Sequence, residues 1–120
     1  MPPKRNPGKP RSRAHRGSVG SRQSLIELPA TGCNLPVPAM PAGRSWTPAE
    51  KSRWNELWES PQACQWDETA RGTVACLVIY ESEIFASTAT AWQAQESRHA
   101  ADALGLTPRA LTALGWRTVE

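Results

Sequence analysis

Cysteine and histidine, the usual ligands of structural zinc, are scarce in this sequence. Cys33, Cys64 and Cys76 show no CxxC spacing, and His15 and His99 stand far apart. A structural zinc site needs four such ligands at close spacing, so the pattern argues against a metal centre. An odd number of cysteines also argues against a disulfide framework, and we expect free thiols in a reducing compartment.

Long hydrophobic runs are missing as well. The longest, Val74–Tyr80, has seven residues, whereas a helix that spans a membrane needs about 20. The basic stretch at the N-terminus is not followed by an apolar stretch, so we expect no secretory signal and no membrane partner.

The motifs of the common enzyme classes are also absent. The sequence has no glycine-rich phosphate loop, no nucleophile motif and no paired histidines. Neighbouring carboxylates such as Glu81 and Glu83 would point to different faces of a helix, so they cannot form a general acid/base pair. We therefore expect a protein that is not an enzyme and needs no cofactor.

Proline and tryptophan divide the chain into two parts. Eight of the 11 prolines lie in residues 1–41, and all six tryptophans lie in residues 46–116. We expect residues 1–45 to be a disordered basic arm with a proline-rich linker, and residues 46–120 to be the folded domain. A domain of about 75 residues buries a modest share of its surface, so self-association or a partner would stabilise it.

Acidic residues are missing from the first 26 positions, which gives this segment a charge of +7. Residues 27–120 hold seven Lys or Arg and 11 Asp or Glu, which gives −4. Basic arms of this kind bind phosphates in a salt-dependent way without reading base sequence. A solubilising tail is the alternative interpretation. The candidate DNA-binding residues are Lys4, Arg5, Lys9, Arg11, Arg13, Arg16 and Arg22.

The linker between arm and domain has prolines at near-alternate positions in Leu35–Pro41. This spacing favours an extended, polyproline-like geometry. Such a segment either lies along a neighbouring surface or, as we expect here, only spaces the arm from the helical body.

Capping signals predict the first two helices of the domain. Thr47–Glu50 has the form of a capping box with proline at the first helical position, and Ser60-Pro61 ends this helix near residue 59. Asp67 is the expected N-cap of the second helix, which extends to about Ser87. Residues 73–80 have strand propensity on their own, but their flanking residues favour one continuous helix.

Two further helices are predicted in the C-terminal third. Residues 89–104 form an alanine-rich helix with Gly105 just beyond its end, and residues 107–114 repeat the Thr-Pro start signal. This pair could be taken for a helix-turn-helix reader of DNA. Its second helix offers only Arg109 and Thr112 to base edges, which favours a packing hairpin.

The large apolar residues indicate a core that extends into a subunit contact. Tryptophan buries a large area and is favoured at interfaces. The middle of the second helix is apolar nearly all round, which indicates contact on more than one side, and another subunit is one way to cover the second side. The candidate core or oligomer-interface residues are Trp54, Trp58, Leu77, Val78, Ile84, Phe85 and Trp92.

Several short segments are shared with a known family. They are Trp54-x-x-Leu57-Trp58-x-Ser60-Pro61 followed by Trp66, Gln95-Glu96-x-Arg98, Leu104-Gly105-Leu106-Thr107-Pro108 leading to Leu114 and Trp116, and Asn6-Pro7-Gly8-Lys9. On these residues the chain resembles the small terminase subunits of tailed bacteriophages, especially those that infect actinobacteria. It departs from the family in its last helix, where Arg109 is the only charge between Asp102 and Arg117.

The helices predicted above make the fold class all-α, with about four helices, and the resemblance implies that the domain assembles as a ring oligomer. It also implies that the protein binds double-stranded viral DNA at the packaging start site in the host cytoplasm. Its protein partner would be the large terminase subunit, which holds the ATPase and nuclease. The alternative function is a small phage-encoded DNA-binding regulator without a packaging role.

Overall fold

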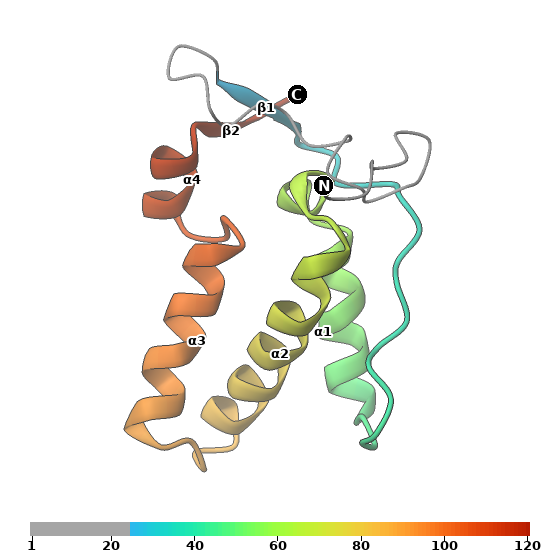
Figure 1. Cartoon of the computed structure of the whole chain (residues 1–120), viewed down its shortest axis with the longest axis vertical. Coiled ribbons are helices and arrows are strands. Elements are labelled where there is room, and N and C mark those ends of the chain that lie inside the picture. The colour runs from blue at the N-terminus through green and yellow to red at the C-terminus, as the bar shows by residue number, and fades with distance from the viewer. Residues whose placement is uncertain (1–24) are drawn as a thin grey trace, which may run out of the picture.

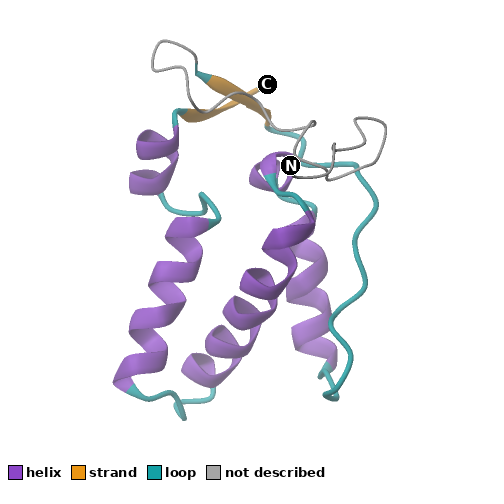
Figure 2. Ribbon diagram, in the orientation of Figure 1, coloured by secondary structure: helices purple, strands orange, loops and turns teal. Residues whose placement is uncertain are grey.

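Helices make up just over half of the chain that the structure describes. The structure is a computed structural model in which residues 25–120 are described (Figures 1 and 2), and the predicted arm with its seven cations lies outside this range. The expectation of a mostly helical domain is confirmed. In chain order the elements are β1 (Ile26–Pro29), α1 (Pro48–Trp58), the 3-10 helices η2 (Pro61–Gln65) and η3 (Glu68–Ala70), α2 (Arg71–Phe85), α3 (Ala91–Ala103), α4 (Pro108–Leu114) and β2 (Trp116–Val119).

The first helix begins at the predicted capping box. The backbone N–H of Glu50 donates to the Thr47 hydroxyl at 3.1 Å, and the Thr47 N–H donates to the Glu50 carboxylate at 2.8 Å. The helix ends at Trp58, with Glu59 as the C-cap residue, as predicted. This box fixes the first turn of α1.

The ambiguous apolar segment is helical, as predicted. Asp67 accepts a hydrogen bond from the Thr69 N–H at 2.9 Å, but the helix it caps is not α2, which begins at Arg71 with Ala70 as its N-cap. The capped turn is the 3-10 helix η3, which leads directly into α2. The helix ends at Phe85, two residues before the predicted end at Ser87, where a positive φ of 60° turns the chain toward α3.

The third and fourth helices also lie where they are expected. Gly105 adopts a φ of 75°, and the N–H groups of Gly105 and Leu106 donate to Asp102 and Ala101 carbonyls at 3.1 and 2.9 Å. This pattern is a Schellman ending, which requires a left-handed residue after the helix. Thr107 then caps α4 through the N–H of Ala110.

A short sheet corrects the all-α prediction. Strands β1 and β2 pair in parallel, with Ile26 opposite Trp116 and Pro29 opposite Val119. Leu28 in β1 is fully buried. The pairing joins the two ends of the described sequence. It places β1 at the end of the domain where α4 stops (Figure 2).

The proline-rich segment is part of the folded body and not a spacer, which corrects the expectation for this part of the linker. The indole N–H of Trp54 donates to the Pro38 carbonyl at 2.8 Å, and the Arg71 Nε donates to the Ala39 carbonyl at 2.7 Å. Val37 and Met40 pack against the core. This segment belongs to no helix or strand, so its carbonyls are free to accept these hydrogen bonds.

Three tryptophans form the centre of the core. Trp58 contacts the ring of Trp54 at a centroid distance of 5.6 Å and that of Trp66 at 5.1 Å. The indole N–H of Trp66 donates to the Leu104 carbonyl at 2.8 Å, which ties η2 to the end of α3. Helix α2 lies between α1 and α3 (Figure 1). One end of the molecule therefore carries the sheet, and the other carries the α2–α3 turn and the start of α1.

Candidate functional site

Large apolar side chains are exposed where α2 turns into α3. Phe85 exposes 84% of its surface, Trp92 exposes 61% and Ile84 exposes 37%. Tyr80 contacts the Trp92 ring edge to face, with centroids 6.2 Å apart. We call these four residues the aromatic end. Large apolar side chains exposed at one end of a small domain are typical of a contact site for another molecule.

Local backbone chemistry places these residues together. The N–H of Thr88 donates to the Glu83 carbonyl at 2.9 Å, which closes the end of α2. Thr90 then starts α3 through a capping box with Gln93, in which both hydrogen bonds are formed, at 2.8 and 3.1 Å. This box was not predicted, although Thr followed three residues later by Gln is its usual sequence signal. The tight turn brings Trp92 back beside Tyr80.

A groove of about 460 Å³ lies beside Phe85, between the first turn of α1 and the last two turns of α2. Most of its lining surface is apolar, and its polar lining residues come from both helices. Its lining residues are Ala49, Glu50, Arg53, Val78, Glu81, Ser82, Phe85 and Ala86. Sequence reasoning did not find this groove, because it depends on how α1 and α2 are set against each other.

The rim of the groove is held by an ion pair between α1 and α2. Arg53 donates through Nε and Nη2 to the two carboxylate oxygens of Glu81 at 2.8 and 3.1 Å, and through Nη1 to Glu56 at 3.1 Å. The hydrogen bond to Glu81 raises the pKa of Arg53. A planar fork of this kind fixes geometry as well as charge. The groove is therefore a formed feature with a defined edge.

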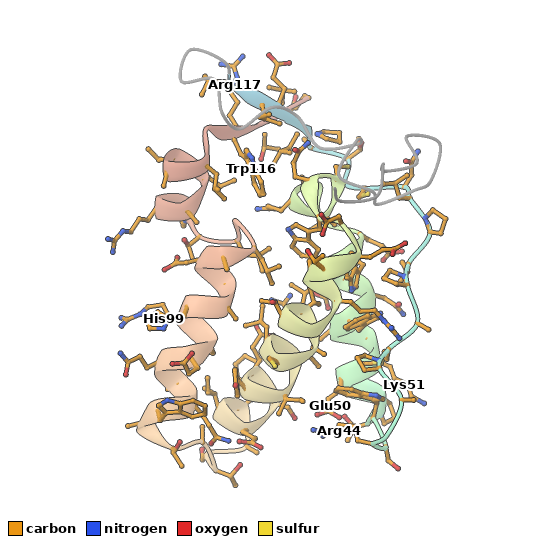
Figure 3. All side chains as sticks on the ribbon, in the orientation of Figure 1. Arg44, Glu50, Lys51, His99, Trp116 and Arg117 are labelled. Atoms are coloured by element: carbon orange, nitrogen blue, oxygen red, sulfur yellow. The ribbon has the colours of Figure 1, made fainter. Side chains whose placement is uncertain are left out.

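Glu50 also lines the groove, and its side chain is almost fully buried. The backbone N–H of Thr47 lowers its pKa most, burial opposes this by raising it, and the charge of Arg44 lowers it further. Arg44 Nη2 lies 3.3 Å from the carboxylate, and Figure 3 shows the two side chains together at the start of α1. The carboxylate is thus kept ionised within a mainly apolar wall.

The other candidate interface residues lie in the core. Trp54, Trp58, Leu77 and Val78 are all buried within the described chain. Their burial makes them structural residues of the domain. Only Ile84, Phe85 and Trp92 of the predicted set are placed where another molecule can reach them.

The α3–α4 face is a second candidate surface. Arg98, His99 and Arg109 border a depression of about 850 Å³, and Figure 3 shows His99 pointing outward from α3. Asp102 in its floor accepts a hydrogen bond from the Thr107 hydroxyl at 2.6 Å. Helix α4 therefore packs through Ala110 and leaves Arg109 at the surface.

Comparison of the chain with protein families, with characterised proteins and with solved structures found no match. Within residues 25–120 no group of His, Cys, Asp or Glu is placed to hold a metal ion. None of the helices in this range is long and apolar enough to cross a bilayer. Within the same residues, the aromatic end combines exposed apolar side chains with a formed groove.

The acidic residues of the segment that includes α1 and α2 are shared between these helices and the stretch that joins them. Residues 47–90, which include α1 and α2, carry three Lys or Arg and seven Asp or Glu, which gives −4. Residues 91–120, which include α3 and α4, carry three of each and are neutral apart from His99. Glu59, Asp67 and Glu68 account for three of the acids in residues 47–90 and lie in neither helix, so α1 and α2 themselves carry three Lys or Arg and four Asp or Glu.

Proposed function

We propose that this protein is the small subunit of a bacteriophage terminase, a non-enzymatic adaptor that binds viral DNA and recruits the large subunit for genome packaging. The observation that carries the proposal is the combination of a +7 segment without acids and an acidic helical body that exposes Phe85 and Trp92. The first feature suits binding to phosphates, and the second suits self-association. The shared segments described above supply the family.

The two features support each other in this role. A single arm with seven cations gives weak binding that does not depend on DNA sequence. Several copies held together by their bodies present many arms at once, and avidity raises the affinity without any new contact. The helices themselves need no catalytic group, because the bond chemistry of packaging belongs to the large subunit. The proposed site of action is the host cytoplasm.

The arm is tested by DNA binding at several salt concentrations. We expect log K for duplex DNA to fall with log salt at a slope of about −6 for each engaged arm, because seven phosphates are neutralised. Deleting residues 1–24 removes this dependence and weakens binding at least tenfold. Fluorescence anisotropy with a labelled duplex measures both quantities.

A charge-conserving variant is the matched control for this experiment. Replacing the five arginines of the arm by lysine keeps the +7 charge, so the slope is expected to stay within about one unit. Unchanged binding after deletion of residues 1–24 would contradict the proposal. Capture of the large terminase subunit from the same genome tests the packaging role, and DNA binding without such capture would favour a small phage regulator.

A further inference from the structure

A pocket of about 260 Å³ lies next to the point where the basic arm joins the folded body. The N–H of Ile26 donates to the Gly115 carbonyl at 2.7 Å, and Ile26 stands opposite Trp116 in the sheet. Leu114 and Trp116, the two neighbours of Gly115 in the chain, line the pocket. Figure 1 shows this junction at the end of the molecule where α4 leads into β2. The described chain therefore begins beside the pocket.

The lining of this pocket, which also draws on η2, η3, α2 and α3, is anionic. The side chain of Asp67 is almost fully buried, and none of the described lining residues is a Lys, Arg or His. Trp66 and Trp116 also line it, and indole rings attract cations through their faces. Thr73 and Gln65 add oxygen atoms that accept hydrogen bonds. A guanidinium group, with five donors and a positive charge, matches this lining.

We propose that Arg22 of the same chain occupies this pocket, where its guanidinium pairs with the Asp67 carboxylate and anchors the base of the arm to the body. Arg22 lies outside the described range, four positions before Ile26. Four residues of extended chain reach at most about 14 Å, and Ile26 is bonded to the residue between two that line the pocket. Residues 1–26 hold no acid, and Arg22 is the only Lys or Arg in residues 17–25.

The anchor separates the base of the arm from the part that meets DNA. The six cations left for phosphates are Lys4, Arg5, Lys9, Arg11, Arg13 and Arg16. Salt screens a partly buried ion pair much less than exposed charges, so the anchor persists at salt concentrations that weaken phosphate contacts. The contact between arm and body does not require DNA and goes beyond the proposed function. Only its effect on DNA binding rests on that function.

The test follows the indole N–H signals of Trp66 and Trp116 by NMR in the full chain. The six tryptophans give six such signals, which single Trp→Phe variants assign. Arg22→Gln removes the proposed occupant's charge, so the signals of the two pocket tryptophans are expected to shift. The signal of Trp54, which does not line the pocket, is expected to stay in place and shows that the core is intact. Arg16→Gln is the matched control, because it removes the same charge from the arm beyond this reach, and it should shift neither pocket signal.

A second pair of variants changes the acid in the pocket. Asp67→Asn keeps the oxygen that caps η3 but loses the charge. In this background Arg22→Gln is expected to cause no further shift of the two indole signals. Glu68→Gln is the control, because it removes a neighbouring acid that does not line the pocket. In the Glu68→Gln chain, Arg22→Gln should still shift both signals.

DNA binding gives a second, independent readout. Each phosphate contact contributes about 0.9 to the slope of log K against log salt. An anchored Arg22 makes no such contact, so Arg22→Gln is expected to leave the slope unchanged, whereas Arg16→Gln reduces its magnitude by about 0.9. Asp67→Asn releases Arg22 to the DNA, and the magnitude of the slope should rise by about 0.9.

The outcomes separate the anchor from the proposed function. The anchor is overturned if Arg22→Gln leaves both pocket signals in place, or if Arg16→Gln shifts them equally. If unlabelled wild-type chain restores the wild-type signals of ¹⁵N-labelled Arg22→Gln chain on mixing, the occupant is the arm of a neighbouring copy, which overturns the contact within one chain. A chain that shows the expected shifts but binds no DNA keeps the anchor and loses the proposed function. A chain that binds DNA without any Arg22-dependent shift loses the anchor alone.

Discussion

At Gly105 both backbone conformation and packing exclude a side chain. Its φ is 75°, and a Cβ there would lie 2.2 Å from Cζ3 of Trp116. Figure 3 shows Trp116 directed from β2 into the body. Because alanine would suffer both left-handed strain and overlap with a rigid ring, Gly105→Ala should lower the free energy of unfolding by about 2–4 kcal/mol. Urea denaturation followed by tryptophan fluorescence measures this change.

Gly43→Ala is the control for backbone strain alone. Gly43 also has a positive φ, 103°, but a Cβ there would meet no atom within 4 Å. Its substitution should cost about 1–2 kcal/mol. Equal losses in the two variants would show that Gly105 does not approach Trp116 as closely as the structure places it.

Several single-residue roles could be predicted because they depend on local chemistry. Thr47, Asp67 and Thr107 each cap a helical turn within three residues of their own position, so the signal is contained in a short stretch of sequence. The close contact between Gly105 and Trp116 could not be predicted in the same way. Gly105 was expected only as a helix end, and its packing partner is 11 residues further along the chain.

At the scale of elements, α1 depends on the ionised carboxylate of Glu50. Because the pKa of Glu50 is lowered by folding, chiefly through the Thr47 N–H, its stabilisation is fully present above the unfolded-state pKa. It is lost as the pH falls through the lower folded-state pKa. Glu50→Gln keeps the capping acceptor but loses the charge, so we expect a loss of about 1 kcal/mol at pH 7. The difference from wild type should vanish in acid.

Thermal unfolding between pH 3 and pH 7 measures this effect. Glu56→Gln is the control, since it removes the same charge from the same helix at an exposed position. We expect this control to change stability by no more than about 0.5 kcal/mol. A Glu50→Gln protein with the same pH dependence as wild type would contradict the role assigned to the carboxylate.

Helices were easier to predict than strands in this chain for a physical reason. A helix satisfies its hydrogen bonds within a few residues, so caps and periodicity indicate its bounds. The pairing of Glu27 with Arg117 joins strands of four residues each that are 90 positions apart. Nothing in either short segment identifies its partner. The sheet, and with it the role of residues 26–29, therefore emerged only from the structure.

At the scale of the whole molecule, burial separates residues that look alike in the sequence. Leu77 and Val78 are buried, whereas Ile84 and Phe85 one to two turns later are exposed. All four fit the same apolar stripe along α2, so periodicity predicted their helix but not their environment. The difference arises because α1 and α3 cover the middle of α2 and leave its end open. The groove likewise depends on this arrangement of helices.

The boundary of the folded body gives the last prediction. Residues 25–45 contribute the fully buried Leu28 and the Pro38 carbonyl that accepts from Trp54. Deleting residues 1–45 removes strand β1 and these contacts, whereas deleting residues 1–24 leaves them in place. The shorter deletion should keep a cooperative thermal transition. The longer one should lose it, because such a small domain has only about 5–15 kcal/mol of total stability.

Leu28→Ala in the full chain isolates the largest of these contributions. Removing a fully buried leucine leaves a cavity where β1 covers the core, and it should cost about 2–5 kcal/mol. Near-ultraviolet circular dichroism of the tryptophans, recorded during heating, follows the core directly. If the chain without residues 1–45 melted at the same temperature as the chain without residues 1–24, residues 25–45 would be a linker after all. A melt lost only in the longer deletion would place the start of the domain at β1, directly after the arm.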